Sequence, residues 1–168
     1  MPAPLRPLRL LALACVAVLV ACGGPRPKPQ PLPRFTAPTR HKGEVSANDI
    51  LFRAIALVGT PYRYGGNTPQ GGFDCSGLVY YAYEQAGYRV PRTSQELFRA
   101  ARKISVDDAD PGDLMFFQDQ TKLSHVGIYL GDGLFVHAPA SGQNVAVGSL
   151  DSAYYQQHLV AVGRLLPH

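Results

Sequence analysis

Three side chains in this sequence, Cys75, His125 and His137, have the types needed for a thiol hydrolase site. A cysteine nucleophile needs a neighbouring base, commonly histidine, and a third group that orients this base. Cys75 follows Asp74 at the start of a run with helical apolar spacing, so we expect the thiol at a helix N-terminus. The partial positive charge there lowers the pKa of a thiol. A buried, inert cysteine is the alternative interpretation.

The spacing of the two histidines predicts that they share one face of a β-hairpin. Turn residues at 131–133 separate two runs of alternating apolar residues. If the loop has three residues, Leu130 pairs with Leu134, and His125 and His137 become diagonal neighbours about 7–8 Å apart. A two-residue loop would shift the register by one and send the two rings to opposite faces.

Helical apolar spacing predicts the elements that carry Cys75 and its surroundings. Each predicted helix begins at a polar residue that can cap it, and Thr93 with Glu96 forms a capping box. The predicted helices span about residues 46–58, 75–85 and 93–104.

From residue 113 onward, the apolar residues alternate with a period of two, which predicts antiparallel strands. The candidate strands are residues 113–117, 125–130, 134–138, 144–147 and 159–165. Helices followed by such strands indicate an α+β fold, with N-terminal helices packed on a small antiparallel β-sheet. Gly127, opposite His137 in the three-residue-loop register, leaves room between the imidazoles.

Residues 1–21 have the features of an export signal. Two arginines precede an apolar run that is too short to span a bilayer comfortably. The run ends in Leu-Val-Ala-Cys, the pattern of a bacterial lipoprotein signal, so we expect Cys22 to be the lipidated first residue of the mature protein. A plain secretory signal with an incidental cysteine is the alternative.

The segment 22–45 is rich in proline and predicts an extended tether that cannot build a core. The folded domain is then expected at 46–168. We expect a protein of the cell envelope, anchored by its lipid to the outer membrane and facing the periplasm if the cell is Gram-negative.

The composition argues against nucleic acid as a partner and indicates which cysteine stays as a free thiol. The net charge is +4, and Lys and Arg do not cluster on any predicted element, so nucleic-acid binding gains little support. Cys15 leaves with the signal and Cys22 is acylated, so Cys75 remains unpaired in an exported, oxidising compartment. An unpaired thiol there is a liability unless it is protected or used.

A zinc site is the chemical alternative, because one cysteine and two histidines can ligate this metal. No fourth ligand and no tight ligand spacing are evident in the sequence. The sequence therefore does not favour a zinc site, and hydrolysis by a thiol and two histidines would need no metal and no organic cofactor.

Five blocks in order along the chain resemble the NlpC/P60 family of cysteine peptidases. The resemblance covers about residues 46–166 and is carried by residues 73–79, 91–95, 111–114, 124–129 and 137–138. It implies a papain-like core and cleavage of peptide bonds in peptidoglycan stem peptides or their crosslinks. It also implies that Cys75 is the nucleophile, His125 the base and His137 the third polar group.

The resemblance further implies that Tyr62 places a hydroxyl near the thiol and that Asp74 and Ser76 help bind the stem peptide. Asp74 as a simple helix cap and Ser76 as a space-filling residue are the alternatives. Arg92 could meet a substrate carboxylate or close a turn, and we favour the turn. Two other functions stay open: an inactive wall-binding lipoprotein, and an amidase or acyltransferase on the same fold. We expect a monomer that acts on peptidoglycan.

Overall fold

The computed structural model describes residues 46–119 and 122–166. The predicted export signal, the lipidated Cys22 and the Pro-rich tether lie outside the described residues. Within the described part of the chain, no helix has the length and apolar character to cross a membrane.

Three helices occupy the first half of the folded domain: α1 (Ala47–Ile55), α2 (Cys75–Gln85) and α3 (Ser94–Ala100). Ser46 caps α1 by accepting a hydrogen bond from the backbone N–H of Asn48. Thr93 and Glu96 form the predicted capping box of α3. The sequence therefore predicted all three helix starts within one or two residues, because each start depends on local capping chemistry.

The second half forms a six-stranded antiparallel sheet with the strand order β3-β8-β4-β5-β6-β7. The strands are β3 (Arg102–Ile104), β4 (Leu114–Asp119), β5 (Lys122–Gly131), β6 (Leu134–His137), β7 (Ala146–Ser149) and β8 (Leu159–Arg164). Two short strands, β1 (Asn67–Thr68) and β2 (Gly72–Phe73), pair with each other between α1 and α2. The α+β prediction is confirmed.

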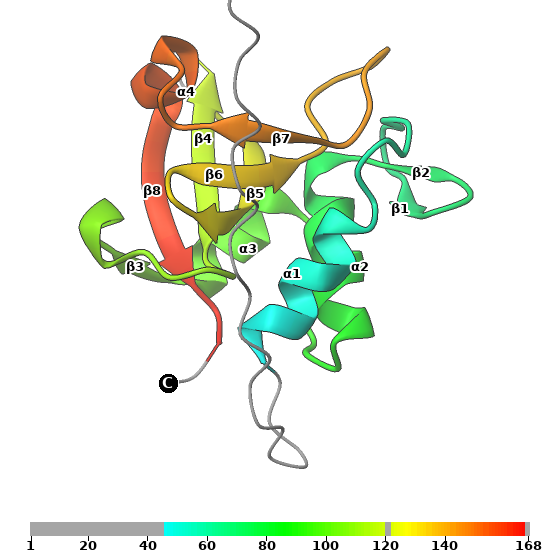
Figure 1. The fold of residues 1–168 in the computed structure, drawn as a ribbon, viewed down its shortest axis with the longest axis horizontal. Coiled ribbons are helices and arrows are strands. Elements are labelled where there is room, and N and C mark those ends of the chain that lie inside the picture. Colours follow the sequence, from blue (N-terminus) through cyan, green and yellow to red (C-terminus); the bar gives the residue numbers. More distant parts are fainter. Residues whose placement is uncertain (1–45, 120–121, 167–168) are drawn as a thin grey trace, which may run out of the picture. The chain divides into compact units, whose positions relative to one another are not determined.

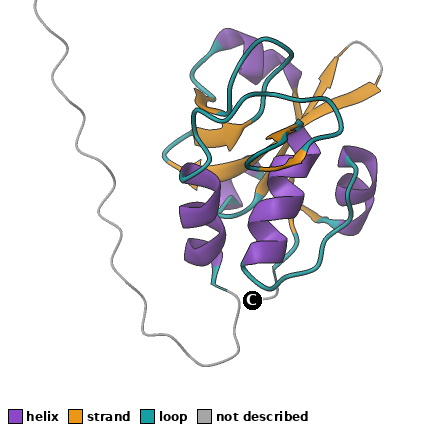
Figure 2. Ribbon diagram, turned by 90° about the vertical axis from the view of Figure 1, so that its right-hand side faces the viewer, coloured by secondary structure: helices purple, strands orange, loops and turns teal. Residues whose placement is uncertain are grey.

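The helices α1 and α2 lie side by side, and α2 packs against β5 (Figures 1 and 2). Their inward faces bury Ile50, Leu51, Ala54, Leu78, Val79 and Ala82 against Val126, Ile128 and Val136 of the sheet. The other face of the sheet carries a second apolar cluster around Met115, Phe117, Phe135 and Val162. Helix α4 (Ala153–His158) contributes Tyr155 to that second cluster.

Two segments of the fold differ from the sequence prediction. The third helix ends at Ala100, and Ile104 lies in the edge strand β3, paired with β8, rather than on a helix face. The segment around His158 forms α4 instead of a polar turn. These elements are three to six residues long, so their formation depends on neighbours distant in sequence.

The turn between β5 and β6 has two residues, and a bulge restores the register. Asp132 and Gly133 both have positive φ, 51° and 72°, as a type I′ turn requires. Gly131 pairs with Leu134, so the predicted pairing of Leu130 with Leu134 is wrong. The bulge at Leu130 then returns the strands to the pairing expected for a three-residue loop, with Tyr129 opposite Phe135.

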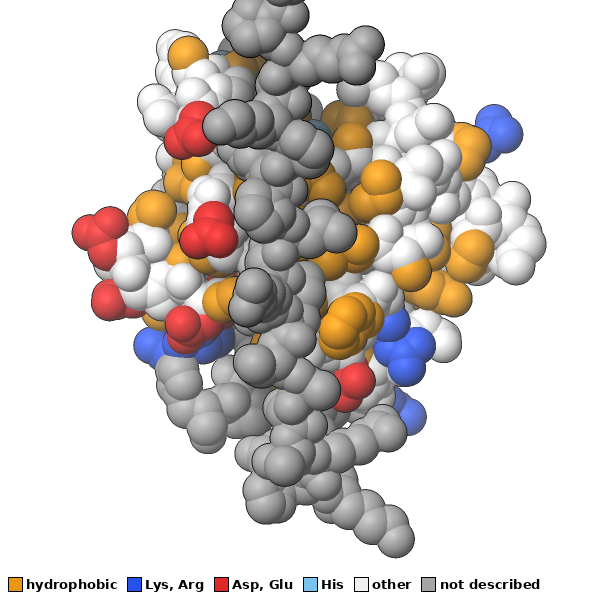
Figure 3. Space-filling model, in the orientation of Figure 1, with side chains coloured by type: hydrophobic (Ala, Val, Ile, Leu, Met, Phe, Trp, Pro, Cys, Tyr) orange, Lys and Arg blue, Asp and Glu red, His pale blue; other side chains and the backbone are white. Residues whose placement is uncertain are grey.

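The surface carries charges of both signs. On the described part of the face in Figure 3, the Lys and Arg side chains that are visible stand in separate places. This face therefore offers no extended basic patch of the kind that follows a phosphate backbone.

Candidate active site

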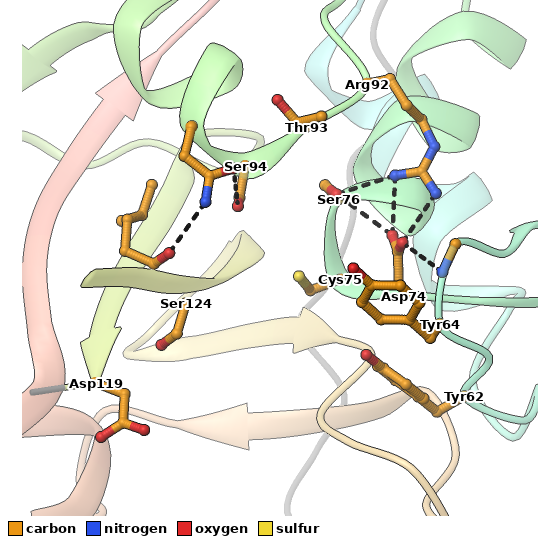
Figure 4. A pocket seen from close by; sticks show the side chains of 13 residues that line it. Tyr62, Tyr64, Asp74, Cys75, Ser76, Arg92, Thr93, Ser94, Asp119 and Ser124 are labelled. Carbon is orange, nitrogen blue, oxygen red and sulfur yellow. Dashed lines mark hydrogen bonds and ion pairs between the residues drawn. The ribbon is translucent and has the colours of Figure 1, made fainter.

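Cys75 is the first residue of α2, and its side chain is partly buried at the edge of a pocket of about 700 Å³. Figure 4 shows the sulfur projecting into the space between Ser124 on one side and the Asp74–Arg92 pair on the other. The backbone of Val126 contacts the thiol, so the sulfur faces the segment of β5 that carries His125.

The prediction of a lowered thiol pKa is wrong. Burial raises the pKa of the Cys75 thiol, and the neighbouring Asp74 carboxylate raises it further. Hydrogen bonds from the backbone of Val126, Ser76 and Cys75 itself act in the opposite direction and do not compensate. The thiol is therefore neutral at rest.

The two predicted histidines lie on one face of the β5–β6 hairpin, as expected from the sequence. Nε2 of His125 is 2.8 Å from Nδ1 of His137, which is a direct hydrogen bond between the rings. Nδ1 of His125 is the ring nitrogen that this bond leaves for another partner. The rings of Phe117 and Phe135 pack against the pair and hold it in place.

Both imidazoles are neutral. Burial, together with the smaller effect of the nearby His137, lowers the pKa of His125 to about 3. Burial also lowers the pKa of His137 to about 4. A neutral His125 is in the protonation state that a general base needs.

Asp74 does more than cap α2. Its Oδ1 accepts a hydrogen bond from the N–H of Gly77 at 2.6 Å, and the same carboxylate pairs with both terminal nitrogens of Arg92, at 3.0 Å and 2.9 Å. Arg92 also donates to the hydroxyl of Ser76 and to the carbonyl of Gly66. The interpretation of Arg92 as a turn residue is therefore wrong, because its side chain joins the pocket wall to the helix cap (Figure 4).

Tyr62 lines the same pocket as Cys75. Burial raises the pKa of Tyr62, and the charges of Cys75 and Asp74 raise it further, which places its hydroxyl within electrostatic reach of the thiol. Its backbone is held by a bridge to Phe73 and a hydrogen bond to the carbonyl of Gln143.

A second pocket, of about 330 Å³, lies beside the first and shares Asp119 and Ser124 with it. Its walls include His125, His137 and Tyr155. The hydroxyl of Tyr155 is 3.4 Å from Nε2 of His137. Sequence reasoning missed this tyrosine, because α4 has only six residues and no apolar repeat that would predict it.

Zinc binding is not supported by the arrangement of these side chains. Among residues 46–119 and 122–166, no group of three or more His, Cys, Asp or Glu side chains is placed to hold a metal ion. The two histidines point ring nitrogens at each other, at hydrogen-bond distance. A nitrogen engaged in this way is not free to ligate a metal.

A model of the NlpC/P60 family matches residues 59–164. The chain belongs to the NlpC/P60 family. It is 40% identical over 133 residues to murein DD-endopeptidase MepH of Escherichia coli, covering 75% of this chain and 49% of MepH. It is 41% identical over 119 residues to the bifunctional muramidase/DL-endopeptidase CwlT of Bacillus subtilis, covering 69% of this chain and 36% of CwlT.

Solved structures of the family share the fold. The NlpC/P60 domain of the peptidoglycan hydrolase SagA superposes with a TM-score of 0.63 at 36% identity, covering 71% of this chain and 99% of that domain. An NLP/P60 family protein from Staphylococcus aureus, described as similar to lipoprotein, superposes with a TM-score of 0.67 at 37% identity, covering 80% of this chain and 45% of that protein. The chain thus spans half or less of MepH, CwlT and the S. aureus protein, and nearly all of the SagA domain.

Proposed function

We propose that this protein is a peptidoglycan endopeptidase that hydrolyses peptide bonds in stem peptides or their crosslinks. One observation carries the proposal: His125 is bonded through Nε2 to His137 and lies on the strand whose next residue contacts the Cys75 thiol. This is the arrangement that a thiol hydrolase needs. Relatives at about 40% identity are named as endopeptidases, which supports the substrate class.

In the proposed mechanism, the sulfur of Cys75 attacks the carbonyl carbon of the peptide bond while its proton passes to Nδ1 of His125. The backbone N–H of Cys75, at the start of α2, donates to the oxygen that gains negative charge. His125 then returns the proton to the leaving nitrogen as the C–N bond breaks. Water hydrolyses the thioester and restores the thiol.

The roles proposed for the pocket residues follow from their positions. Asp74 and Ser76 line the groove beside the nucleophile and face the substrate with polar oxygens. Arg92 balances the charge of Asp74, so the site presents a neutral hydrogen-bonding wall rather than an isolated carboxylate. Tyr62 places its hydroxyl on the same side of the groove and supports the oxyanion or the bound peptide.

The location in the cell is part of the proposal. Lipidation of Cys22 after removal of residues 1–21 would anchor a monomer to the cell envelope, and the Pro-rich tether would let it reach peptidoglycan. The S. aureus relative described as similar to lipoprotein supports this layout.

Mass spectrometry of defined muropeptides tests the proposal. We expect new fragments from cleavage within the stem peptide or its crosslink, full loss of cleavage after iodoacetamide, and no loss after EDTA. Cleavage only between the sugar and the first L-alanine would indicate an amidase instead. Intact muropeptides at every enzyme concentration would favour the inactive wall-binding alternative.

A further inference from the structure

The hydrogen bonds around the histidines form a chain that continues beyond His137. His125 contacts His137 through Nε2 and Nδ1 at 2.8 Å, and His137 contacts the hydroxyl of Tyr155 through Nε2 at 3.4 Å. A neutral imidazole carries one proton on one of its two nitrogens. The two hydrogen bonds are therefore linked. Either each group donates to the next one from His125 to Tyr155, or each donates to the next one from Tyr155 to His125.

Only one direction leaves His125 able to act as a base. If Nε2–H of His137 donates to Tyr155, then Nδ1 of His137 accepts the Nε2–H of His125, and Nδ1 of His125 keeps a free lone pair. If Tyr155 donates instead, the protons shift along the chain, and Nδ1 of His125 carries a hydrogen that cannot accept the thiol proton. Which partner donates in the hydrogen bond between His137 and Tyr155 thus decides whether Nδ1 of His125 can accept a proton.

We propose that Tyr155 is a positioning residue whose phenolic oxygen accepts the Nε2–H of His137 and so selects the base-competent tautomer of both histidines. This inference rests on the proposed function for its catalytic consequence, but the tautomers are a property of the resting protein. Tyr155 touches no reacting atom in this scheme and acts only through His137.

The surroundings of Tyr155 suit this role. Its ring packs edge-on against Phe135 and His137, with centroids 4.9 Å and 5.4 Å apart, and also against Phe117. This packing fixes the phenolic oxygen. Tyr155 is only partly buried, so its own O–H proton can point to water in the adjacent pocket while the oxygen accepts. Burial raises the pKa of the phenol, which keeps that proton in place.

The test is long-range ¹H–¹⁵N correlation NMR of the histidine rings at neutral pH, combined with steady-state kinetics. In the unaltered protein we expect a proton on Nε2 and none on Nδ1 for both His125 and His137. A proton on Nδ1 of His137 would overturn the proposal without any variant. The measurement remains valid if no peptidoglycan is cleaved, so failure of the proposed function is seen separately.

Tyr155→Phe removes one oxygen and keeps the ring. We expect the ¹⁵N shifts of His137 to move toward a mixture of tautomers and kcat to fall by about five- to tenfold, with KM within about twofold, as for loss of one hydrogen bond. Tyr154→Phe, at the exposed neighbour on α4, is the matched control and should leave both readouts unchanged. A purely structural role of Tyr155 predicts unchanged tautomers and unchanged kcat in Tyr155→Phe, and this result would overturn the inference.

Discussion

At the residue scale, the resting site combines a neutral thiol with a neutral imidazole. Burial dominates at Cys75 and at both histidines, so it disfavours the charged form of each group. In the proposed mechanism, proton transfer from the sulfur to His125 therefore accompanies attack on the substrate rather than preceding it. The hydrogen bond between His125 and His137 fixes the orientation of the His125 ring.

The lowered histidine pKa values predict that acid weakens the fold. An unfolded histidine binds a proton near pH 6.5, whereas folded His137 binds one only near pH 4. Between these values the unfolded state holds more protons, so the free energy of unfolding decreases as the pH falls, by up to about 1.4 kcal/mol per pH unit for one histidine. His137→Asn should show a shallower decrease in urea titrations from pH 7 to pH 4. Equal slopes in the two proteins would contradict the buried, neutral state of His137.

The sequence was enough to single out the three side chains of the candidate site, but not to predict their electrostatics. A lone cysteine before a helix and two histidines flanking a turn are visible as residue types and spacing. The pKa of Cys75 depends instead on how completely the packing of α2 against β5 buries the thiol, and on its distance to the Asp74 carboxylate. Arg92 was misjudged for the same reason, because its partners lie 16 to 26 residues away in the chain.

At the element scale, the β5–β6 hairpin brings the two histidines together. The alternation of apolar residues, with a three-residue loop, predicted that the two histidines share a face. In the structure a two-residue type I′ turn and a bulge at Leu130 place them on that same face. Sequence alone did not reveal the bulge, since a two-residue and a three-residue loop both fit Gly-Asp-Gly. The short elements β3 and α4 also escaped prediction, and α4 supplies Tyr155.

A substitution at Gly127 tests how tightly the β5–β6 hairpin is packed. A Cβ at this position would lie 2.8 Å from Cδ2 of Phe135 and 3.1 Å from the carbonyl oxygen of Val136. Because Phe135 is fully buried, β6 must shift, and His137 shifts with it. We expect Gly127→Ala to lower the free energy of unfolding by about 1–3 kcal/mol and to reduce kcat.

The control for that variant is Val147→Ala on the exposed edge strand β7. It should change the free energy of unfolding by less than about 0.5 kcal/mol, measured in the same urea titration. If Gly127→Ala matches the unaltered protein in both stability and kcat, the close packing between β5 and β6 is not what holds His137.

At the scale of the whole molecule, the family match covers residues 59–164, and the proposed anchor lies outside it. We therefore expect that removal of the membrane anchor leaves the rate of hydrolysis unchanged. Cys22→Ser should abolish the mass added by a lipid and move the protein from the detergent phase to the aqueous phase. Its rate on soluble muropeptides should stay within about twofold of the lipidated protein, because acyl chains contribute membrane affinity only. Cys22→Ser that still partitions with membranes would contradict the lipid anchor.

We propose above all that the sulfur of Cys75 is the nucleophile for peptide-bond hydrolysis in peptidoglycan. The most direct measurement is the rate at which purified Cys75→Ala releases fragments from a defined, crosslinked muropeptide, compared with the unaltered protein. We expect the rate of Cys75→Ala to be lower by at least about 1,000-fold, with the melting temperature nearly unchanged. Cleavage by Cys75→Ala at the rate of the unaltered protein would contradict it.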